Sequence, residues 1–203
     1  VVRSTEWDNG AATNAGAVTW GSGTSGISGV VGAGNSLVGS TGGDQVGIGG
    51  ITALSNGNYV VRSYKWANGT ATEAGAVTWG SGTSGISGVV DAGNSLVGST
   101  ASDQVGNGGI TALSNGNYVV RSYSWDNGTA TNAGAVTWGD GSAGISGEVS
   151  ATNSLVGSVA NDNVGDGGIT ALSNGNYVVR SVYWAKGAAT NAGAVTWGDG
   201  SAG

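Results

Sequence analysis

The side chains best suited to binding or catalysis recur at a single spacing. The tetrapeptide Val-Val-Arg-Ser begins at Val1, Val60, Val119 and Val178, so the chain repeats every 59 residues. Such a chain builds one supersecondary unit several times, and any site is expected at equivalent positions of every unit. Three recurring series are candidates: two of tryptophan, and one that combines arginine with aspartate.

The first tryptophan series lies in a loop shortly after the Val-Val-Arg-Ser segment. An exposed indole can stack on the C–H face of a sugar while a nearby amide binds its hydroxyls. This predicts a carbohydrate site in each repeat, formed by Trp7, Trp66, Trp125, Trp184, Asn68 and Asn127. The residues that flank each Trp vary between copies while the Trp does not, which favours a structural anchor over a row of equal sugar sites. Both interpretations stay open at this point.

The second tryptophan series ends an Ala-Val-Thr-Trp segment. Its members are Trp20, Trp79, Trp138 and Trp197. Val and Trp alternate in this segment, so both fall on one face of an extended strand, and we expect that face to be buried. A buried indole removes on the order of 200 Å² of apolar surface from water. This series is therefore predicted to form part of the core.

Arginine and aspartate supply the charged positions that do not change between copies. They are Arg3, Arg62, Arg121, Arg180, Asp44, Asp103 and Asp162. The planar guanidinium fork suits a carboxylate, so one Arg and one Asp per period predict a structural ion pair within or between repeats. The alternative is an anion or ligand site that recurs around an axis.

Catalysis and metal binding find little support in the sequence. The chain has no His and no Cys, which excludes imidazole and thiolate nucleophiles and metal ligands. The loop 161–168 alternates Asp and Asn as a calcium loop does, but its two earlier copies retain one carboxylate each. We therefore expect no enzyme activity, no metal site and no cofactor.

Composition narrows the partners. Six Lys and Arg residues and a net charge of −6 leave no basic patch for nucleic acid or for an anionic membrane surface. No apolar run is long enough to insert into a membrane. The low charge and the many small residues favour a secreted or cell-surface setting.

Short strands separated by turn signals make up each period. In residues 110–158, Ile-Thr-Ala-Leu and Tyr-Val-Val-Arg-Ser flank an Asn-Gly turn and predict a hairpin. Ala-Val-Thr-Trp and Ser-Leu-Val follow as a third and a fourth strand. Glycine interrupts every segment that would otherwise have helical periodicity. The chain is therefore predicted to be all-β and to form one repeat domain, 1–203, with repeats 1–59, 60–118 and 119–177 and a partial repeat 178–203.

Four strands per repeat, with Leu-Ser-Asn-Gly-Asn-Tyr-Val-Val in the inner turn and Ala-Val-Thr-Trp-Gly at the end of the third strand, resemble a WD-type β-propeller blade in outline. The family's Asp after Trp is Gly here, at positions 21, 80, 139 and 198, and the family's His is absent, so its Asp–His network is not implied. The repeat also resembles near-identical repeats of very large bacterial surface proteins of unassigned function. The resemblance implies a propeller of four-stranded antiparallel blades, and a β-solenoid or open repeat array is the alternative.

One chain holds too few repeats to close a ring, because propellers need at least four blades. We therefore expect self-association, with a homodimer as the leading assembly. The predicted role is a non-enzymatic structural or adhesion module of a secreted or surface protein. A multivalent carbohydrate-binding lectin and a filament-forming structural protein are the alternatives.

Overall fold

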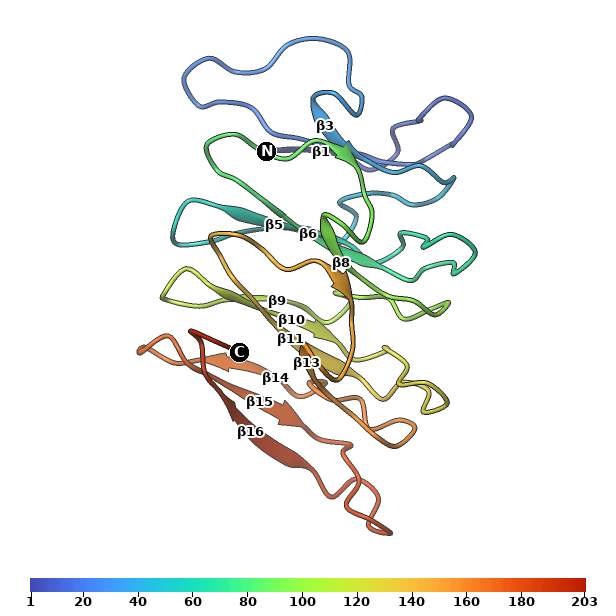
Figure 1. The fold of residues 1–203 in the computed structure, drawn as a ribbon, viewed down its shortest axis with the longest axis vertical. Coiled ribbons are helices and arrows are strands. Elements are labelled where there is room, and N and C mark those ends of the chain that lie inside the picture. Colours follow the sequence, from blue (N-terminus) through green and yellow to red (C-terminus); the bar gives the residue numbers. More distant parts are fainter.

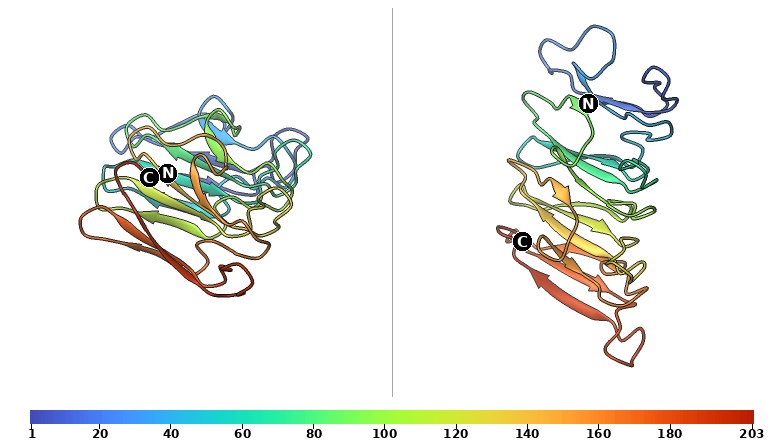
Figure 2. Two further views of the ribbon diagram at one scale, coloured as in Figure 1. Left: turned by 60° about the horizontal axis from the view of Figure 1, so that its bottom comes forward. Right: turned by 45° about the vertical axis from the view of Figure 1, so that its right-hand side comes forward.

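The chain forms four small β-sheets that follow one another in an open column, and each sheet after the first takes its first strand from the end of the preceding repeat. The computed structural model describes residues 1–203, which contain 16 strands and no helix. The first and last sheets lie at opposite ends of the column in Figure 1 and in the right-hand view of Figure 2. The sheets close neither a barrel nor a propeller within the chain.

The second sheet shows the complete unit. Its strands β4 (Gly50–Ala53), β5 (Tyr59–Ser63), β6 (Ala76–Gly80) and β8 (Ser95–Val97) pair antiparallel in chain order. These are the four strands that the sequence predicts. A four-stranded antiparallel meander is therefore present, and the predicted ring of blades is not.

The other sheets repeat this order with parts missing at the two ends. The first sheet lacks the first strand of the unit, and the fourth sheet lacks the last. The remaining strands of this kind are β1 (Val2–Ser4), β2 (Ala17–Thr19), β3 (Ser36–Val38), β9 (Gly109–Ala112), β10 (Tyr118–Ser122), β11 (Ala135–Gly139), β13 (Ser154–Val156), β14 (Gly168–Ala171), β15 (Tyr177–Ser181) and β16 (Ala194–Gly198).

Two very short strands connect neighbouring sheets. Strand β7 (Gly88–Val89) pairs parallel with β3 of the preceding sheet, and β12 (Gly147–Glu148) pairs parallel with β8. The Val149 N–H extends the second pairing by donating to the Val97 carbonyl at 3.0 Å. Each repeat thus adds an edge strand to the sheet before it, in a Gly-rich stretch where the sequence predicts no strand.

The core lies between the sheets. Successive residues of a strand point to opposite faces, so Val61 packs with Val18 of the first sheet while Val60 packs toward the third sheet. Three apolar clusters fill the three gaps between the four sheets. Burial of each such valine stabilises the column by about 1.5–3 kcal/mol, so most of the stability depends on contact between adjacent repeats.

In the second, third and fourth sheets a tyrosine begins the second strand and covers a glycine on the neighbouring strand. Tyr118 lies opposite Gly139, and a Cβ added to that glycine would stand 2.3 Å from the tyrosine ring. The Tyr118 hydroxyl is buried near the backbone of Ile145 without a hydrogen bond of ordinary geometry. Burial therefore raises the pKa of Tyr118, and it also raises the pKa of Tyr59 and Tyr177.

These shifts predict a loss of stability in alkali. A raised folded-state pKa gives a contribution that is complete below the unfolded value of about 10 and is lost as the pH rises through the folded value. We expect the urea midpoint of the wild type to fall above about pH 10. Tyr118→Phe should unfold at nearly the wild-type midpoint at pH 7 and should lose less on going to pH 11. A steeper alkaline loss in Tyr118→Phe than in the wild type would contradict this explanation.

Candidate functional site: the open ends of the column

The loop tryptophans of the inner repeats are buried and do not form exposed platforms. Trp66 and Trp125 are 4% and 5% exposed and belong to the clusters between sheets. The loop turns inward because the Trp66 N–H donates to Ser63 and the Trp66 carbonyl accepts from Gly75, each at 2.9 Å. Trp7 and Trp184, in the end repeats, are half-buried. The predicted sugar-stacking role of this series is wrong for the inner repeats, because an indole within the core cannot face a ligand.

The asparagines predicted to bind sugar hydroxyls are committed to the backbone. The Asn68 side-chain amide donates to the Gly98 carbonyl at 2.9 Å, and that of Asn127 donates to Gly157 at 2.8 Å. Each thereby ties the loop to the chain beyond the fourth strand. The amide donor of each side chain is therefore used within the fold, and the ligand-binding role of Asn68 and Asn127 stays a prediction.

The predicted ion pair is also corrected, because arginine and aspartate have separate partners. The Arg62 guanidinium donates to the carbonyls of Gly49 and Gly106. Burial lowers the pKa of Arg62. Arg3 and Arg121 make the matching bonds to Gly47 and Gly165. Each of these guanidinium groups therefore donates to backbone carbonyls of loop glycines instead of to a carboxylate.

The buried aspartates accept only backbone N–H groups. One Asp103 oxygen accepts from Ser99 and Thr100 at 3.0 and 2.8 Å, and the other accepts from Asp126 of the next repeat at 3.0 Å. Burial raises the pKa of Asp103, and the three N–H groups oppose that shift. Asp44 and Asp162 hold the same positions. Each aspartate therefore joins two successive repeats.

The second tryptophan series forms a polar joint between repeats, together with two asparagines. The indole N–H of Trp79 donates to the Gly141 carbonyl of the next repeat at 2.9 Å. The side-chain amides of Asn56 and Asn58 donate to the same oxygen, each at 2.8 Å. One carbonyl in the turn 139–144 thus accepts three hydrogen bonds. Sequence reasoning missed both asparagines, although they recur in every Ser-Asn-Gly-Asn turn.

The same turn packs against the ring that donates to it. A Cβ added to Gly144 would stand 2.6 Å from the Cβ of Trp79. Only glycine fits this close approach, and the positive φ of 81° also favours it. The joint recurs one period later, where Trp138, Asn115 and Asn117 donate to Gly200. The predicted core role of these tryptophans holds in part, since Trp79 and Trp138 are half-buried and pack against apolar clusters.

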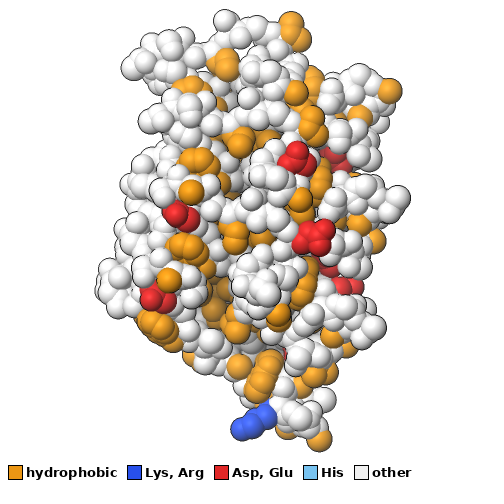
Figure 3. All heavy atoms as spheres, viewed as in Figure 1, with side chains coloured by type: hydrophobic (Ala, Val, Ile, Leu, Met, Phe, Trp, Pro, Cys, Tyr) orange, Lys and Arg blue, Asp and Glu red, His pale blue; other side chains and the backbone are white.

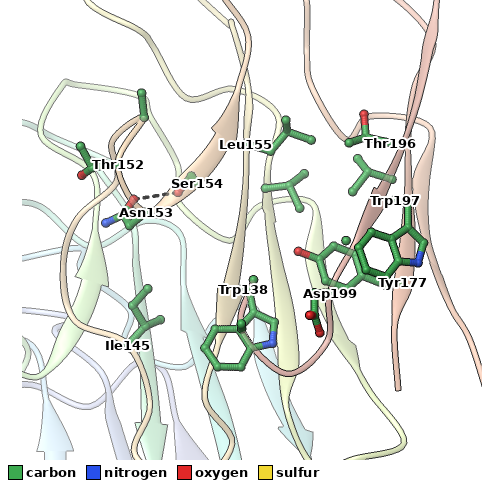
Figure 4. A pocket seen from close by; sticks show the side chains of 16 residues that line it. Trp138, Ile145, Thr152, Asn153, Ser154, Leu155, Tyr177, Thr196, Trp197 and Asp199 are labelled. Atoms are coloured by element: carbon green, nitrogen blue, oxygen red, sulfur yellow. Dashed lines mark hydrogen bonds between the residues drawn. The ribbon is translucent and has the colours of Figure 1, made fainter. Parts of the chain in front are cut away.

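The equivalent tryptophan of the last sheet is Trp197, at the C-terminal end of the column. Trp197 is 59% exposed and Val195 is 73% exposed. Strands β13 and β16 each leave one edge unpaired, and Leu155 of β13 is 39% exposed although its equivalents Leu37 and Leu96 are fully buried. Figure 4 shows Trp138, Tyr177 and Trp197 around the resulting pocket, which has a volume of about 540 Å³. The end of the column is therefore an apolar surface with hydrogen-bonding groups at fixed positions.

The N-terminal end presents the opposite half of the joint. The turn 21–26 is equivalent to 139–144, and its Gly23 and Gly26 are exposed, with open space where a Cβ would lie. Val2 and Val30 are exposed as well. The two ends thus carry complementary halves of the contact that joins the repeats inside the column.

The acidic side chains of the loop 161–168 and of the pocket bond to nearby backbone groups. The structure contains no group of three or more acidic side chains able to hold a metal ion. In the loop 161–168, Asp162 caps the turn and Asp166 accepts the Val182 N–H at 2.8 Å. In the pocket, the Asp199 carboxylate accepts from the backbone and hydroxyl of Ser201, and these bonds lower the pKa of Asp199. The chain also has no helix of the length and apolar character needed to cross a membrane.

A comparison with known families agrees with this division into units. The model of a repeat of unknown function, DUF5650, matches residues 1–48, 53–107, 112–166 and 171–203. The matches 53–107 and 112–166 each begin at the last residue of the first strand of a unit, β4 or β9. Each then covers the other three strands of that unit. No curated protein matches the chain significantly. Because the four matches cover nearly the whole sequence, the chain belongs to this DUF5650 repeat family.

Proposed function

We propose that the chain is a non-enzymatic structural repeat, which holds or displays other parts of a secreted or cell-surface protein at a fixed spacing. One observation carries the proposal: the recurring Asp, Arg and Asn side chains bond to the backbone of the same layer of the column or of a neighbouring layer. The buried Asp series, the Arg series and the turn asparagines all follow this rule. Groups engaged in this way stabilise a column and are not free to bind a ligand.

The surface supports the same function. On the face drawn in Figure 3, charged side chains are few and scattered, and apolar side chains lie between the layers of the column. Repeat columns gain stability from each interface between neighbours. An added repeat therefore extends such a protein without requiring a new core.

The test is a variant that carries one more repeat, made by inserting a second copy of residues 60–118 after residue 118. We expect it to unfold in one transition with a higher free energy of unfolding than the wild type, because it adds a complete interface. Chemical denaturation followed by circular dichroism measures this difference.

A glycan array supplies the opposing outcome. We expect neither protein to bind. Binding to a related group of sugars, lost in Trp197→Ala while the fold survives, would overturn the structural function. It would assign the pocket beside Trp197 to a carbohydrate instead.

A further inference from the structure

Asparagine followed directly by glycine is the pair of residues most prone to lose its side-chain amide, because glycine places no side chain in the path of the reaction. The chain contains this pair at Asn9, Asn56, Asn68, Asn107, Asn115, Asn127 and Asn174. The sequence alone ranks all seven pairs alike. The structure divides them into two classes by the surroundings of the glycine nitrogen.

Three pairs lie at the exposed tip of the loop that follows each Val-Val-Arg-Ser strand, and we call them the open pairs. Asn68 and Ala71 exchange two backbone hydrogen bonds of 3.0 Å, and the exposed Gly69 lies in the turn between them. The Gly69 N–H donates to no group of the protein, and a Cβ added there would meet nothing within 4 Å. Gly10 and Gly128 are equivalent in each respect.

In the other four pairs, the held pairs, the glycine N–H is bonded within the fold. A backbone carbonyl accepts, at 3.1 or 3.2 Å, from each of Gly57, Gly108, Gly116 and Gly175. The Asn56 side chain is fixed as well, because its oxygen accepts from the Asn58 N–H at 3.1 Å while its amide donates to Gly141. Both partners of the reaction are therefore restrained in the held pairs.

We propose that Asn9, Asn68 and Asn127 are sites of spontaneous deamidation, one in each of the first three repeats. The Gly69 nitrogen loses its proton to solvent and attacks Cγ of Asn68, which forms a C–N bond. The bond from Cγ to Nδ2 breaks, and the amide nitrogen takes up a proton and leaves as ammonia. Water then opens either carbonyl of the resulting succinimide, and the product is aspartate or isoaspartate.

The free N–H favours the open pairs because the attack begins with loss of that proton, and a bonded N–H must first break its hydrogen bond. Asn68 must also rotate about its Cα–C bond, which opens its bridge to Ala71. That bridge is separate from the sheets, whereas the turn at Asn56 joins β4 directly to β5. A short exposed turn opens locally more often than a hairpin that is continuous with a sheet.

The reaction removes a contact that each of these loops makes with its own layer. The Asn68 amide that leaves is the group that donates to the Gly98 carbonyl at 2.9 Å. A carboxylate in its place cannot donate, and each event adds one negative charge to a chain whose net charge is −6. Isoaspartate also lengthens the backbone of the turn by a methylene group. The modification therefore releases the tip of the loop from the chain beyond the fourth strand.

The fourth loop supplies a matched control within the chain. Lys186 stands where the other loops have asparagine, and it forms the same bridge with Ala189 through backbone bonds of 2.9 and 3.0 Å. The turn therefore forms without the asparagine. Asn68→Lys removes one reactive side chain and keeps the turn, and the triple variant Asn9→Lys, Asn68→Lys, Asn127→Lys removes all three.

The experiment is incubation of the folded protein in mildly alkaline buffer below its thermal midpoint, followed by peptide mapping of each site by mass spectrometry. We expect aspartate and isoaspartate to accumulate at the open pairs at least about tenfold faster than at the held pairs, whose hydrogen bonds must break first. In urea all seven sites should react at similar rates, because the unfolded chain restrains none of them. Asn68→Lys should abolish the reaction at residue 68 and leave it unchanged at residues 9 and 127.

Three results would overturn the assignment. The first is a folded protein in which Asn68 and Asn127 react no faster than Asn56 and Asn115. The second is a folded protein that forms no product at the open pairs while the same protein reacts in urea. The third is a triple variant, folded by its thermal midpoint, that loses ammonia as fast as the wild type. None of them bears on the structural function, which the inserted repeat and the glycan array test.

Discussion

Replacing Trp125 with alanine is expected to lower the free energy of unfolding by about 3–5 kcal/mol, the usual loss when a buried Trp is truncated. The ring is 5% exposed and contacts the cluster between the second and third sheets, where no solvent could fill the space it leaves. Denaturant unfolding followed by circular dichroism measures the loss. The effect should be among the largest of any single substitution, because the cavity opens where two repeats meet.

Two companion variants separate burial from other roles of tryptophan. Trp125→Phe keeps most of the apolar contact and removes an indole N–H that is buried without a partner, so it should recover much of the stability. Trp197→Ala removes an exposed ring and should change the stability by less than about 0.5 kcal/mol. Trp125→Ala with wild-type stability would contradict the buried position of the loop series.

Asp103→Ala is expected to destabilise the fold by roughly 3 kcal/mol or more, since three backbone N–H groups would lose their acceptor inside the protein. Two of them lie in the turn after β8 and the third is in the next repeat, so the substitution loosens the turn and the junction together. Thermal and chemical denaturation both report the change.

Asp126→Ala is the control for this position. The backbone N–H of Asp126 donates to the Asp103 carboxylate. Alanine stands at the positions equivalent to Asp126, 67 and 185. We expect that variant to stay close to the wild type. Equal losses from the two substitutions would show that the Asp103 carboxylate has no special role at the junction.

Periodicity and turn chemistry were sufficient to predict the strands of each unit. The Asn-Gly turn between β9 and β10 forms as predicted, with the Leu113 N–H donating to Asn117 at 2.8 Å. Alternation in Ala-Val-Thr-Trp predicts strand β11 but does not show that the ring reaches the next repeat. Local pattern defines strands and turns, whereas the path from one sheet to the next depends on long-range contacts.

The failures at the candidate sites have a common cause. Loops in this chain are rich in glycine and contain few strand contacts, so their backbone groups need partners from side chains. Arg62 and Asp103 serve that need separately, where charge alone predicts that they pair. The two-residue strands β7 and β12 were beyond prediction for the same reason, since Gly-Val and Gly-Glu have no strand signature outside their pairing.

The repeats stack into an open column, and the most direct test of this arrangement is the length of the molecule in solution. Small-angle X-ray scattering would compare the wild-type chain with the same chain carrying one and then two inserted copies of residues 60–118. We expect the maximum dimension to grow by a similar increment with each insertion. A dimension that stops growing while the mass increases would show that the repeats curve into a ring, and it would contradict the open column.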